Sequence, residues 1–111
     1  MSVTHELGEV VAERRLEAVA EDGTRTPVIV RLGTPEPDPH PEARGDWHCP
    51  RQILGLGDEA VATSYGVDSL QAFLLSVYAT RLQLEERARV ASVRLNWLGQ
   101  EGLGLEVDPR I

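Results

Sequence analysis

Three side chains that can take part in catalysis or metal binding lie close together, at Asp46, His48 and Cys49. Carboxylate, imidazole and thiolate groups bind zinc or iron, and a thiolate beside an imidazole can act as a nucleophile. His48 and Cys49 are adjacent, however, so in a strand they would point to opposite faces, and the chain has no second cysteine. We therefore predict no metal site, no cofactor and no catalytic residue. An alternative pocket of a small enzyme or ligand-binding domain, built from these three residues, stays open.

Composition removes several other classes of chemistry. All 11 basic residues are arginine, so neither a lysine Schiff base nor a phosphate-binding lysine loop can form. With 18 acidic residues the net charge is -7, which disfavours nucleic acid and anionic membranes as partners and favours a basic protein. The same charge is equally consistent with a role in solubility alone. The longest apolar stretch, 70–79, is far shorter than the roughly 20 residues of a membrane-spanning helix. We expect a cytoplasmic protein, because Cys49 has no disulfide partner and the first residues do not resemble a secretion signal.

Alternating and apolar runs separated by turn residues predict strands. Runs at 15–20 and 27–32 flank Asp22-Gly23, a strong hairpin signal, and runs at 47–56 and 59–65 flank Gly57-Asp58. Pro50 limits the paired part of the third run to 51–56. A strand is expected at 92–98, with a short final strand at 103–107. Between the hairpins, prolines at every second place make 33–46 an extended spacer or exposed arm, or simply a surface loop.

A long helix is predicted at 68–88. Asp68 can cap its first turn, and Gln71 can reach back to the Asp68 amide as in a capping box. At about 100° per residue one apolar stripe should face the sheet and a polar strip should face water. The sheet-facing stripe comprises Leu70, Phe73, Leu74, Val77, Leu84 and Ala88, and the polar strip comprises Ser76, Thr80, Gln83 and Arg87. A second apolar stripe, Leu75, Ala79 and Leu82, lies on roughly the opposite side from the first and, with Tyr78, is a candidate interface.

These elements predict a single α+β domain over residues 1–111, with an antiparallel sheet of four to six strands and one long helix packed on one face. Both tryptophans are expected in the core rather than at an interface. The expected core is Val28, Val30, Leu32, Trp47, Ile53, Leu70, Phe73, Leu74, Val77, Leu95 and Trp97.

Several motifs occur in an order that resembles a known family. They are Gly45-Asp46-Trp47-His48-Cys49-Pro50, then Gly66-Val67-Asp68-Ser69-Leu70-Gln71-Ala72, then Leu95-Asn96-Trp97-Leu98-Gly99. This pattern is similar to a bacterial family of small proteins known only as a domain of unknown function, and the likeness covers most of residues 13–105. The resemblance implies no activity and no site residues.

The sequence therefore favours a non-enzymatic protein-binding module over an enzyme. It would be an acidic protein of the immunity-like or antitoxin-like type, or a small homodimeric domain. Its partner would be another protein or a second copy of itself, held on the second helix stripe.

Overall fold

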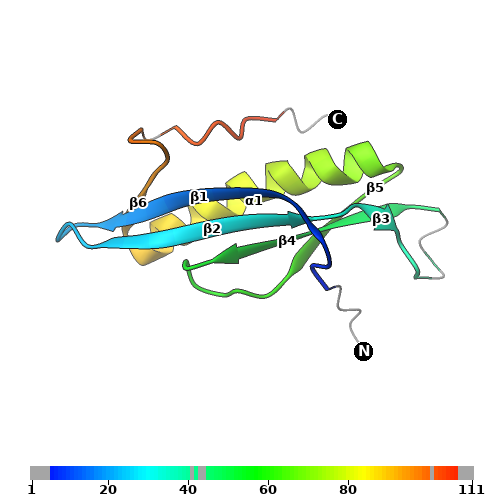
Figure 1. Cartoon of the computed structure of the whole chain (residues 1–111), viewed down its shortest axis with the longest axis horizontal. Helices are drawn as coiled ribbons and strands as arrows, with labels where there is room; N and C mark the ends of the chain where they lie inside the picture. The colour runs from blue at the N-terminus through cyan, green and yellow to red at the C-terminus, as the bar shows by residue number, and fades with distance from the viewer. Residues whose placement is uncertain (1–5, 41, 43–44, 101, 108–111) are drawn as a thin grey trace.

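The computed structural model describes residues 6–40, 42, 45–100 and 102–107. Strand β1 (Val10–Ala20) and strand β2 (Arg25–Gly33) form a long antiparallel hairpin (Figure 1). Its turn has the expected chemistry, because Gly23 takes a φ of 87°, which favours glycine, and the Asp22 carboxylate accepts from the Thr24 amide at 2.9 Å. The first strand begins five residues before the predicted start.

The remaining strands extend this hairpin into one antiparallel sheet. They are β3 (Glu36–Pro37), β4 (Trp47–Leu54), β5 (Ala62–Gly66) and β6 (Val93–Asn96). β6 pairs with β1 on one side of the hairpin and β4 pairs with β2 on the other, while β3 and β5 both pair with β4. A single helix, α1 (Ser69–Ala91), packs against this sheet. The predicted α+β architecture is confirmed.

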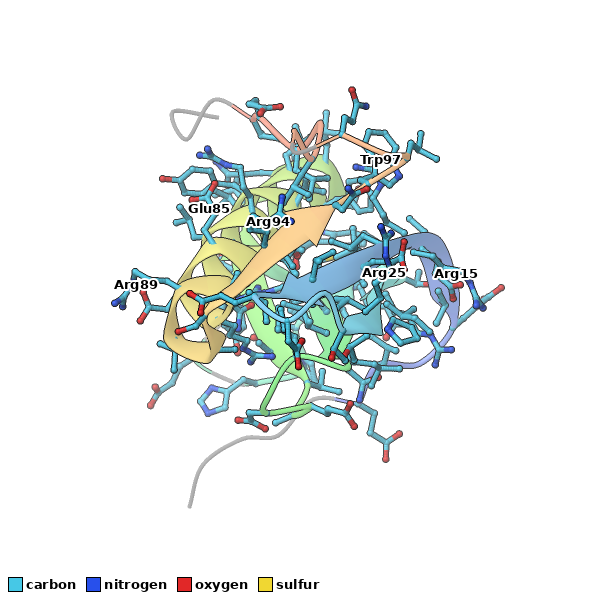
Figure 2. The ribbon with its side chains drawn as sticks, turned by 90° about the vertical axis from the view of Figure 1, so that its left-hand side faces the viewer. Arg15, Arg25, Glu85, Arg89, Arg94 and Trp97 are labelled. Carbon is cyan, nitrogen blue, oxygen red and sulfur yellow. The ribbon has the colours of Figure 1, made fainter. Side chains whose placement is uncertain are left out.

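The two faces of the sheet differ in polarity. Val28 lies opposite Leu16, and Val30 lies opposite Ile53, so these apolar side chains share the face under α1. The other face carries charge: the Glu13 carboxylate pairs with Arg15 at 3.0 Å and with Arg31 at 3.2 Å. Figure 2 shows Arg15 and Arg25 on the side of the sheet away from the helix. The core therefore lies on one face of the sheet, where α1 contributes Leu84 and the C-terminal segment contributes Leu103.

The start of α1 follows the sequence signal with one difference. The Asp68 side chain accepts from the Gln71 amide at 2.8 Å, as the cap predicts. The Gln71 side chain, however, accepts from the Val67 amide at 2.8 Å, one residue before the expected donor. The helix ends at Ser92, whose φ of 57° is left-handed and whose amide donates to the last-turn carbonyls. The helix therefore runs three residues beyond the predicted end.

The rotation of α1 about its own axis differs from the prediction. Ser76 and Thr80, expected to face water, are 0% and 1% exposed, whereas Leu70, expected in the core, is 63% exposed. The residues that α1 buries are Ala72, Ser76, Thr80, Leu84 and Ala88. Small side chains let the helix approach the sheet closely. Both hydroxyls have partners, since Ser76 donates to the Cys49 carbonyl of β4 at 3.1 Å and Thr80 donates to the Ser76 carbonyl of its own helix at 2.8 Å. The predicted inner face is therefore confirmed at Leu84 and Ala88 and wrong nearer the start of the helix, where polarity alone misplaced Ser76 and Thr80.

Other core assignments are mixed. Val28, Val30, Leu32 and Ile53 are buried as predicted, while Leu95 and Trp97 are half-buried against the core. Trp47, Phe73, Leu74 and Val77 were expected inside and are half-buried. The buried apolar residues that the prediction did not include are Leu16, Ala18, Val19, Cys49, Leu56, Ala72 and Leu103.

Two irregular segments also take definite paths. Within the proline-rich stretch, Glu36–Pro37 pairs with His48 and Trp47, so part of the expected spacer is an edge strand; residues 41, 43 and 44 of that stretch lie outside the described residues. Residues 103–107 do not form the expected strand. They run back above β1 and along one side of α1 (Figure 1), where Leu103 is buried and its carbonyl accepts from Arg14. The Arg14 guanidinium also stacks 3.6 Å from the Trp97 ring centroid.

The observed rotation of α1 can be tested by exchanging residue size on its two sides. Replacing Ser76 with leucine should destabilise the fold by about 1–3 kcal/mol, because the larger side chain has no space between α1 and the sheet. Leu70→Ser, on the exposed side, should change stability by no more than about 0.5 kcal/mol. Urea unfolding curves measure both, and the reverse order of the two losses would contradict this rotation.

Candidate interaction surface

A buried arginine fixes α1 on the sheet. Arg51 points from β4 toward the helix and is 9% exposed. Its Nε donates to the Gln83 side chain, and its Nη1 donates to the Ser64 hydroxyl at 2.7 Å and to the Ser76 hydroxyl at 3.4 Å. One guanidinium thus connects β4, β5 and two turns of α1. The sequence analysis identified neither Arg51 nor its hydrogen bonds to α1. The position of an arginine in an alternating strand does not show which helix residues will pack against it.

The charged guanidinium of Arg51 donates its hydrogen bonds to neutral groups. Burial lowers the pKa of its guanidinium; the Cys49 thiol beside it acts in the opposite direction, and the positive charge of Arg87 adds to the lowering. Among the described residues no carboxylate forms an ion pair with Arg51. A planar donor group with several fixed directions makes the rotation of α1 specific, since a turned helix would leave these donors buried without acceptors.

The residues of the alternative pocket do not converge. Cys49, like Arg51 two residues later, points toward α1, so His48 between them points to the opposite face of the sheet. Both side chains are buried. Asp46 precedes β4, and its backbone carbonyl accepts from the Asp38 amide at 2.8 Å. The cavities beside α1, β1 and β6 are lined by other residues.

Cys49 also lacks the surroundings of a reactive thiol. It is 0% exposed, and its Sγ contacts the Gly33 carbonyl at 3.5 Å. Burial raises the pKa of the thiol, outweighing the hydrogen bond from Ser76 and the positive charge of Arg51. Across residues 6–40, 42, 45–100 and 102–107, no group of three or more histidine, cysteine or acidic side chains is arranged to hold a metal ion.

The two long sides of α1 have different surroundings. Phe73 and Val77 line a cavity of about 180 Å³ with Ala12 of β1, Val30 of β2 and Leu105 of the C-terminal segment. A second groove of about 490 Å³ continues between α1, β6 and the same segment. On this side, toward β1, the C-terminal segment therefore lies beside the helix and leaves open grooves between them.

The opposite side of α1 faces β5 and carries the second apolar stripe. A rotation of 100° per residue places Leu75, Ala79 and Leu82 away from Phe73 and Val77. Leu82 is 43% exposed, and Leu75, Tyr78 and Ala79 are half-buried. The predicted interface candidates thus share one accessible surface, which we call the outer stripe: Leu75, Tyr78, Ala79 and Leu82. Farther along, the helix becomes charged: Glu85 and Arg89 lie away from the sheet (Figure 2) and line the groove toward β6.

The comparisons with known proteins add a family and no activity. A family model described as "Domain of unknown function (DUF6968)" matches residues 12–107. No curated protein and no solved structure matches the chain. Within the described residues, α1 is not apolar enough over a sufficient length to span a membrane.

Loss of the Arg51 hydrogen bonds should lower the free energy of unfolding. Arg51→Met keeps the bulk but leaves Gln83, Ser64 and Ser76 without their buried donor, so we expect a loss of about 1–3 kcal/mol in the free energy of unfolding. The matched variant Arg31→Met removes a half-exposed ion pair with Glu13 and should cost less than about 1 kcal/mol. Urea denaturation of the two variants measures the difference in the free energy of unfolding. Equal losses would contradict a special role for the Arg51 hydrogen bonds.

Cys49 should be unreactive in the folded protein. A thiol reagent at neutral pH is expected to label Cys49 only as fast as the protein unfolds locally. The control is a Val90→Cys variant in a Cys49→Ala background. Its cysteine should react at once, because position 90 is 71% exposed. In the unfolded chain the thiol ionises near its ordinary pKa of 9.0, and in the folded chain only at higher pH. Ionisation thus favours the unfolded state, so Cys49 should reduce stability as pH rises above 9.0. Rapid labelling of the native protein would revive the enzyme alternative.

Proposed function

We propose that this chain, which belongs to the DUF6968 family of uncharacterised domains, is a non-enzymatic protein-interaction module that binds through the outer stripe of α1. One observation carries the proposal: beside Leu84, α1 turns hydroxyl side chains inward, while the leucine at position 82 lies on its surface. Ser76 and Thr80 are fully enclosed while Leu82 is 43% exposed.

This arrangement leaves binding energy available to a partner. Enclosing a leucine side chain contributes about 1.5–3 kcal/mol relative to leaving it in water. The fold realises only part of that gain at Leu82 and at Leu75, because the Arg51 network holds the opposite side of the helix against the sheet. A protein surface that covers the outer stripe would obtain it.

The distribution of charge bears on which kind of protein binds. Within residues 68–91 three acidic residues balance three arginines, so the acidic surplus of the chain lies elsewhere, mostly in residues 1–60. A basic partner of the kind that an immunity-like or antitoxin-like protein neutralises would be steered toward that acidic part. The neutral outer stripe is better suited to an apolar, uncharged surface. A bacterial and cytoplasmic setting belongs to the same proposal, and the buried free thiol of Cys49 supports a reducing compartment.

A photo-crosslinking residue on the stripe tests the proposal for a partner of any identity. With p-benzoylphenylalanine in place of Tyr78, illumination in the native cells should give one defined adduct. The same residue in place of Leu98, which is 79% exposed and lies beside Arg15 and Glu17 of β1, should not give that adduct.

A second substitution makes the result specific. Leu82→Glu should change the free energy of unfolding by no more than about 1 kcal/mol, since the side chain is 43% exposed at the surface. In the same protein it should strongly reduce the adduct formed from position 78. No adduct at position 78, or equal adducts at 78 and 98, would refute binding by the outer stripe.

A further inference from the structure

Strand β5 has an open edge beside the outer stripe. It pairs with β4 through Ala62–Gly66, and in the described part of the chain no strand pairs with its other edge. Residues 60–67 are all uncharged. Exposed strand edges normally carry charge, proline or a bulge that prevents pairing with another chain. β5 has none of these.

The opposite edge of the sheet is protected in the usual ways, since its outermost strand, β6, has only 4 residues and carries Arg94, and beyond it part of β1 is left unpaired. β1 has a register irregularity between Val10 and Ala12, and its free part carries Glu13, Arg14 and Arg15. The C-terminal segment also lies over this side, held by Arg14. The contrast singles out β5 as the edge that is suited to pairing.

We infer that β5 and the outer stripe together form the interface of a two-fold dimer, in which β5 pairs antiparallel with β5 of a second copy and extends one sheet through both chains. This inference rests on the proposed function and names its partner. We take the partner to be a second copy because a two-fold axis at Ser64 makes the strand complementary to itself. Tyr65 of each copy then lies opposite Thr63 of the other, and Ala62 lies opposite Gly66. No charged residue is brought against its equivalent, which matters for a chain of net charge -7.

The helix position fits this axis. Strands are about 4.8 Å apart, and α1 packs over β4 and β5, so its axis lies about 5 Å from the two-fold axis. The two helices would then be about 10 Å apart, which is the spacing of directly packed helices. Arg51 bonds both Ser64 and Ser76, so the middle of β5 is level with this turn of the helix. Leu75 and Ala79 lie on that level, and the small Ala79 allows close approach.

Disulfide trapping tests the axis directly. In a Cys49→Ala background, the Ser64→Cys variant places a cysteine opposite its own copy and should give a covalent dimer under mild oxidation. Val11→Cys in the same background, 51% exposed on the opposite edge, is the matched control and should stay monomeric. Light scattering of the unmodified protein should give twice the chain mass of 12.2 kDa.

A charged stripe variant separates this inference from the proposed function. Ala79→Glu should yield a folded monomer, with an unchanged circular dichroism spectrum. A monomer at every concentration, or a dimer that forms no disulfide through Ser64→Cys, would overturn the inference. If at the same time the Tyr78 crosslinker captures a different protein, the interaction module stands and only the second copy is wrong; if it captures nothing, both fail.

Discussion

The hydrogen bonds of Arg51 beneath α1 determine how the rest of the molecule presents itself. A guanidinium taken out of water needs acceptors, and here they are supplied by Ser64, Ser76 and Gln83. Satisfying them requires the polar strip of the helix to face the sheet. The leucines of the outer stripe then have no place inside, so the same contacts that hold the helix also create its accessible apolar surface.

The sequence predicted most of the architecture. The Asp22-Gly23 turn, the alternation of Val28 and Val30, and the Asp68 cap are local signals, and each is borne out because the structure depends on the same local geometry. The helix face was wrong near the start of α1 because periodicity ranks residues by polarity, while a serine or threonine is readily buried when the facing strand offers a partner. Leu75, Ala79 and Leu82 lie along one line of the helix whatever its rotation, so their role as an interface stays a prediction.

Features that join distant segments were harder to foresee. Leu103 is buried because Arg14, 89 residues earlier in the chain, holds its carbonyl and stacks on Trp97. Nothing in the glycine-rich composition around Leu103 signals that contact. The separation of His48 from Cys49 followed from strand alternation alone, whereas the depth at which Cys49 is buried depended on the helix that covers it.

The two sides of the helix now have a common explanation. On the side toward β1, the C-terminal segment lies beside Phe73 and Val77, and the adjoining strand edge is irregular and charged. On the side toward β5, the strand edge is uncharged and the helix above it is apolar. The edge of β5 and the outer stripe of α1 lie at the same level and form one surface. Across the proposed two-fold axis, the two copies of α1 would have the spacing of packed helices. A single symmetric partner can satisfy the backbone of the strand and the leucines of the helix in one contact, which neither a small ligand nor a charged protein surface would do.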